Sequence, residues 1–125
     1  MSFQLVERAA DLPGVVLKEG PHWTNITFRG KGFAWVHHAR DQAMIKVRPE
    51  ERDALLATSP TVYEIGWTTS STAWVRVRLD RADLEEVVEL MEEAWRMTAT
   101  NRAVTAHDAA TAAAEGSTPD GRDTQ

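Results

Sequence analysis

An alternation of apolar and polar positions runs through residues 15–79. It is clearest at residues 73–79, where Ala73, Val75 and Val77 alternate with Trp, Arg and Arg. A period of two residues is typical of a β-strand with one face buried and the other in water. The same pattern predicts five further strands, over residues 15–19, 25–29, 33–38, 43–48 and 62–65.

Three segments have the helical period instead. Residues 2–12 carry apolar positions at roughly helical spacing and end at Pro13-Gly14, and a second helix begins at Pro49 and ends before Pro60. The third begins at Asp83, which forms a capping-box pattern with Glu86. One apolar stripe follows along it and predicts the main core helix, with Leu84, Val87, Val88, Met91, Ala94 and Trp95.

The composition changes at about residue 99. From there on the chain is rich in Ala, Thr, Asp and Gly, and no large apolar residue follows Val104. Such a segment has too little apolar surface to bury, so we expect it to be disordered. The sequence therefore predicts one folded domain over residues 1–98 and a disordered tail over residues 99–125.

Together these elements predict an α+β domain with a single antiparallel sheet and helices packed on one face. At 125 residues the chain is long enough to bury a core without disulfides or metals. If the helices cover one face of the sheet, the other face is left open to solvent. The side chains on that face are the first candidates for a binding surface.

The stretch PHWTNITFRGKGFAWV, residues 21–36, combines two strand-like runs with a turn that we expect at Gly30-Lys31-Gly32. It resembles the signature of the MmcQ/YjbR family. Further similar pieces are Leu12-Pro13-Gly14, residues 50–52, residues 74–77 and residues 93–96, so the resemblance extends over about residues 3–102. It implies a CyaY-like fold and a small bacterial protein described as DNA-binding.

The charge is unevenly distributed along the chain. The net charge is −5, which argues against a simple basic nucleic-acid protein. Residues 21–82, however, carry nine basic and six acidic residues, whereas residues 83–98 carry six acidic residues and a single arginine. The predicted sheet is thus basic and the last core helix acidic.

The basic side chains on the polar side of the strands predict a nucleic-acid surface. With the hairpin tip they are Arg29, Lys31, Lys46, Arg48, Arg76 and Arg78, and we expect them to contact phosphates. Trp74 lies among them and would stack on a base or wedge between bases. The plainer alternative is that a sheet facing water carries Lys and Arg for solubility and edge protection.

The five tryptophans support a second hypothesis, a small-molecule binding or drug-sequestering protein with a Trp-lined cleft. Its candidate ligand contacts are His22, Trp23, Arg29, Trp35 and Trp67, which would hold a planar molecule. The plainer alternative is that large indole rings fill a small core. A third hypothesis is a protein-interaction module that uses Glu85, Glu89 and Glu93, which share one helix face.

Enzymatic and metal-dependent functions find little support. The chain has no cysteine and no recognised catalytic spacing of Ser, His and Asp. His37 and His38 are adjacent, so on a strand they point to opposite faces and cannot bind one metal together. We expect a non-enzymatic monomer without cofactor or metal, and the N-terminus, which lacks an apolar leader, predicts a cytoplasmic location.

Overall fold

The computed structural model describes residues 1–68 and 72–116. Its helices are α1 (Ser2–Ala10), α2 (Pro49–Thr58), α3 (Leu84–Thr98) and α4 (Asn101–Gly116), with a short 3-10 turn at Leu79–Arg81. The strands are β1 (Val15–Glu19), β2 (Thr24–Phe28), β3 (Lys31–His37), β4 (Gln42–Val47), β5 (Tyr63–Thr68) and β6 (Ala73–Arg78). No helix in the described ranges is both long and apolar enough to cross a membrane.

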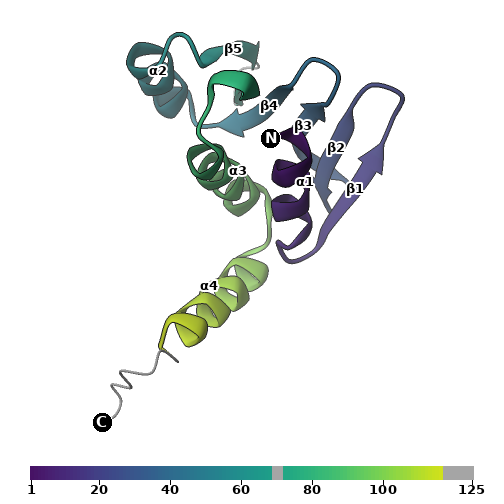
Figure 1. Ribbon diagram of the computed structural model, residues 1–125. Coiled ribbons are helices and arrows are strands. Elements are labelled where there is room, and N and C mark those ends of the chain that lie inside the picture. The colour runs from purple at the N-terminus through teal and green to yellow at the C-terminus, as the bar shows by residue number, and fades with distance from the viewer. Residues whose placement is uncertain (69–71, 117–125) are drawn as a thin grey trace.

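The six strands form one antiparallel sheet in the order β1-β2-β3-β4-β6-β5. Helices α1 and α3 lie side by side across one face of the sheet, and α2 lies at the end near β5 (Figure 1). This arrangement confirms the predicted α+β fold with helices on one face. The face under the helices is called the inner face below, and the opposite one the outer face.

The inner face supplies half of the core. Ile26, Ala34, Ile45 and Val75 are paired neighbours on four adjacent strands, and each is fully buried. They pack with the apolar stripes of the two covering helices, whose buried members are Leu5, Ala9, Val87, Val88, Leu90, Met91, Ala94 and Trp95. The core therefore follows the period-two and helical patterns of the sequence.

Trp95 fastens the last core helix to the start of the sheet. Its ring is fully buried, and its Nε1–H donates to the carbonyl oxygen of Pro13 at 3.0 Å. This bond satisfies the polar atom of a buried indole. A second link joins the two covering helices at the surface, where the guanidinium of Arg8 contacts the carboxylate of Glu85 at 2.9 Å.

The turn between β2 and β3 lies one residue earlier than predicted. Its two central residues are Arg29 and Gly30, with φ of 51° and 82°, and Phe28 pairs with Lys31. Two successive residues with positive φ are typical of the tight two-residue turn that suits a twisted hairpin. Lys31 thus belongs to β3, and a bulge after Ile26 gives room for Phe33 to be fully buried.

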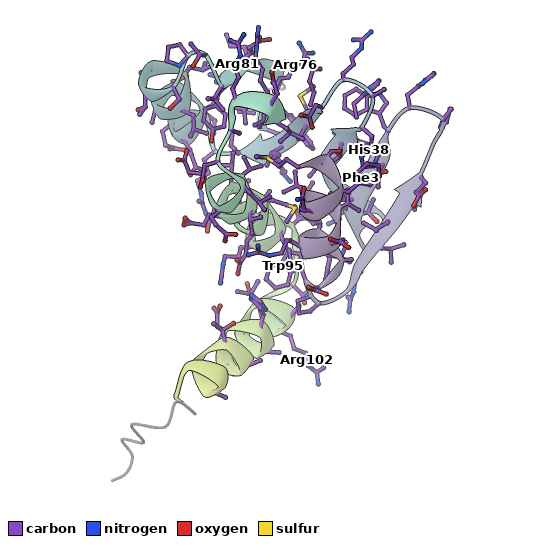
Figure 2. All side chains as sticks on the ribbon, in the orientation of Figure 1. Phe3, His38, Arg76, Arg81, Trp95 and Arg102 are labelled. Carbon is purple, nitrogen blue, oxygen red and sulfur yellow. The ribbon has the colours of Figure 1, made fainter. Side chains whose placement is uncertain are left out.

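Residues 101–116 differ from the expected disordered tail, because they form α4, and residues 117–125 of the predicted tail lie outside the described part of the structure. Alanine is the best helix former, and this segment is rich in it. The helix is also held to α3 by an ion pair between Arg96 and Asp108 at 2.7 Å and by a contact between His107 and Glu92 at 2.8 Å. Its first turn packs against the core through Ala103 and Val104, and the rest of the helix extends away from the sheet (Figure 1). Trp95 lies near its junction with α3 (Figure 2).

Gly14 provides a test of the packing at the start of β1. Its φ is +73°, and a Cβ there would lie 2.5 Å from Cε1 of Phe28, whose ring is buried in the core. We expect Gly14→Ala to lower the free energy of unfolding by about 2–4 kcal/mol, from left-handed strain and overpacking together. Chemical denaturation measures this loss.

Gly30 is the matched control for this prediction. It has a similar φ of +82°, but a Cβ there would meet no atom within 4 Å. Gly30→Ala should therefore cost only the backbone strain, about 1 kcal/mol. Equal losses for the two variants would show that the ring of Phe28 does not confine Gly14.

Candidate nucleic-acid interface

The outer face carries a continuous row of paired residues across five strands. Strand register places Asn25, Trp35, Met44, Arg76 and Glu64 side by side in this order. Two shorter rows flank it, one with His37, Gln42 and Arg78 and one with Lys46 and Trp74. Paired residues share a face of the sheet, so the outer face combines aromatic and basic side chains.

Three of the predicted phosphate contacts, Lys46, Arg76 and Arg78, come together on this face. Arg76 and Arg78 both face the carboxylate of Glu64, Arg76 at 3.8 Å and Arg78 through two hydrogen bonds. Sequence analysis missed this contact, because it depends on how β5 pairs with β6. Glu64 neutralises one of the two arginine charges, so this part of the face is less basic than expected.

The structure places the other three predicted basic residues elsewhere. Arg48 follows the end of β4 and pairs with Glu93 of α3 at 3.6 Å, so it points toward the helical side. Arg29 lies at the hairpin tip, with its guanidinium carbon 5.6 Å from the centre of the Phe28 ring. Lys31 pairs with Phe28, an inner-face residue, so it too is separated from the outer-face group.

The aromatic side chains of the outer face form two close groups. Trp35 and Trp74 have ring centres 4.7 Å apart. Trp23 meets the ring of His37 edge-on at 4.9 Å, and His22 lies parallel to His37 at 6.1 Å. In each group one ring is nearly buried, since Trp74 is 7% and His37 is 9% exposed. Trp74 thus offers little ring surface for the predicted stacking on a base, and Trp35 is the more exposed of the pair.

The residues of the hypothetical small-molecule cleft are only partly together. His22, Trp23 and Trp35 lie on or beside the outer face. Arg29 follows the end of β2, whereas Trp23 precedes its start, so the two lie at opposite ends of that strand. The side chain of Trp67 lies outside the described part of the structure.

The two adjacent histidines point to opposite faces, as expected. The ring of His37 accepts a hydrogen bond at Nδ1 from the backbone N–H of Arg40, on the outer face. His38 lies on the inner side, where its two ring nitrogens contact Ser2 and Thr24 and its ring stacks on Phe3 (Figure 2). Within residues 1–68 and 72–116, no group of three or more His, Asp or Glu side chains is arranged to hold a metal ion.

The acidic residues of α3 lie on the helical side, away from the outer face. Glu85 pairs with Arg8 and Glu93 with Arg48, so two of the three predicted contact residues are partly neutralised. Glu89 lines a hollow of about 320 Å³ between α2 and α3. Its other lining residues are Glu51, Leu55, Tyr63, Glu86, Leu90 and Glu93. Sequence reasoning missed this hollow, because it needs two helices that are far apart in the chain.

Tyr63 reports on this acidic hollow, since it is the only tyrosine in the sequence. Burial, together with the nearby carboxylate of Glu86, raises the pKa of the Tyr63 phenol to about 12. The hydroxyl donates to Oε1 of Glu86 at 3.4 Å. Between about pH 10 and 12 the native state therefore keeps the phenol proton, whereas the unfolded chain, with a phenol pKa of about 10, has lost it.

We expect ultraviolet titration of the native protein to give a tyrosinate midpoint near pH 12. The native state binds more protons than the unfolded state between about pH 10 and 12, so stability should fall as the pH rises through this window. Glu86→Gln should lower the midpoint, because it removes a negative charge. A native midpoint of about 10 would contradict the burial of the phenol.

The fold and the outer face define a small α+β domain with one open, partly basic sheet surface. Residues 10–97 match the model of the YjbR family, so the chain belongs to this family. The crystal structure of the Deinococcus radiodurans protein DR2400, with the domain DUF419, is similar in fold, with a TM-score of 0.66 and 20% identity over 74% of each chain. The comparison with curated proteins gives no match.

Proposed function

We propose that the protein is a non-enzymatic nucleic-acid-binding module, and that Lys46, Arg76 and Arg78 on the outer face contact phosphates. The observation that carries the proposal is that these three side chains share the open sheet face with Trp35 and Trp74, with Lys46 paired with Trp74. Phosphate contacts supply most of the affinity for nucleic acids, and aromatic rings add stacking. The protein would act as a monomer in the bacterial cytoplasm, without a cofactor.

The separation of charge supports this orientation. The acidic residues 83–98 belong mainly to α3, which packs on the inner face, so the sheet lies between them and the outer face. A polyanion approaching the outer face is thus kept at a distance from the acidic residues of α3. Salt screens charges separated by more than about 8–10 Å, which favours the nearby cations further.

Glu64 allows a sharp test of this proposal, because it competes with phosphate for both arginines. Glu64→Gln is expected to strengthen binding to labelled DNA by about fivefold at low salt, the equivalent of about 1 kcal/mol. Fluorescence polarisation over a range of salt concentrations measures this change. The variant should also show a steeper loss of affinity with salt, since more phosphates are neutralised.

Glu85→Gln is the matched control. It changes the net charge by the same amount, but Glu85 is an exposed residue of α3 that pairs with Arg8. Its effect on binding should be small. Equal gains for the two variants would show that only the net charge matters, and absence of DNA binding by the wild-type protein and by Glu64→Gln would refute the proposed function.

A second candidate function rests on Trp23, His22 and His37, whose rings meet at one end of the outer face. This group could bind a planar small molecule, as in the sequestering hypothesis. A ligand that binds only the folded state raises the melting temperature, and the rise grows with the ligand concentration relative to the dissociation constant. We expect planar aromatic compounds that quench tryptophan fluorescence to raise it, and His22→Ala to remove both effects.

A further inference from the structure

The outer-face aromatics are arranged in two tiers. Trp35 and Trp23 are partly exposed, and each contacts a nearly buried ring beside it, Trp74 and His37 respectively. The deeper rings restrict the orientation of the outer ones. An aromatic side chain that is already fixed loses less conformational freedom when another ring stacks on it.

The position of Trp35 in the sheet argues against contact with the bases of a duplex. It lies on β3, which has two strands on one side and three on the other. Strands are about 4.8 Å apart, so the six-strand sheet is about 24 Å wide from edge to edge. The major groove is about 12 Å wide and admits a helix or a two-stranded ribbon. A central strand therefore does not bring an indole to the bases in the major groove of an undistorted duplex.

The hairpin tip is the part of the sheet that fits the major groove of a duplex. The structure separates this tip from the outer-face aromatic rings, called the aromatic platform below. Arg29 and Gly30 form a two-residue turn, and Lys31 pairs with an inner-face residue. Binding to duplex DNA would thus depend on the tip. Binding through the platform needs bases that are unpaired and can lie flat on the rings.

We propose that the ligand of the outer face is single-stranded nucleic acid, whose bases stack on Trp35 and Trp23 while Lys46, Arg76 and Arg78 contact the backbone. This inference rests on the proposed function and narrows its ligand class. The basic residues lie on β4 and β6, to one side of Trp35, whereas Trp23 precedes β2 on the other side. A single strand of nucleic acid can thus run along the two aromatic groups with its phosphates toward β6.

The test compares the full-length protein on labelled oligothymidylate of about 16 nucleotides, on oligouridylate of the same length and on a duplex of about 16 base pairs. We expect tighter binding to a single strand, DNA or RNA, than to the duplex. Trp35→Leu should weaken single-strand binding about tenfold, the usual scale for loss of one stacking contact. Trp35→Phe should restore most of the affinity, since it restores an aromatic ring.

Two further variants keep the test decisive if Trp35→Leu lowers stability. His22→Ala removes an exposed ring that lies parallel to His37 beside Trp23, so it should weaken single-strand binding with an unchanged melting temperature. Arg29→Ala should leave single-strand binding nearly unchanged. Tighter binding to the duplex, with loss in Arg29→Ala but none in Trp35→Leu or His22→Ala, would overturn the inference.

These outcomes are distinct from failure of the proposed function itself. If Glu64→Gln strengthens binding to the duplex but single strands bind no better, the outer face binds nucleic acid and only the single-strand inference is wrong. If none of the three oligonucleotides binds at low salt, both proposals fail together.

Discussion

The packing of α1 and α3 on one face of the sheet is the constraint on which the rest of the structure depends. The inner-face row through Ile26, Ile45 and Val75 needs an apolar cover, and α1 and α3 provide it. Trp95 fixes the position of α3 by its bond to Pro13. Because the cover is on one side, the opposite face must be stable in water, and its Lys, Arg, Glu and Gln side chains follow from that.

Most of the fold could be predicted from the sequence, because the spacing of apolar residues directly reflects burial. The strand at residues 73–79 and the helix after Asp83 are found where the periodicity places them. The hairpin turn is shifted by one residue, since glycines at positions 30 and 32 allow either placement and the bulge beside Phe33 decides between them. The helix α4 differs from expectation because its stabilising contacts, such as that of Asp108 with Arg96, come from a separate helix.

The candidate site was less predictable than the fold, because it depends on register and on strand order. Alternation correctly assigns Arg76 and Arg78 to the polar side of a strand, but it cannot reveal that β5 brings Glu64 beside them. Similarly, Trp74 alternates with apolar residues and is still only 7% exposed. The missing information is pairwise contact between distant segments, which a single sequence does not contain.

At the hairpin tip, the backbone conformation of Arg29 lowers stability while its side chain supplies a positive charge. Arg29 has a φ of +51°, a conformation that costs most residues about 1–2 kcal/mol and that asparagine or glycine adopts more readily. Its guanidinium lies over the Phe28 ring, which offsets about 0.5–1 kcal/mol of this strain. Selection for stability alone would thus favour asparagine there, and any fitness cost of that replacement would measure what the cation contributes to the protein's role in the cell.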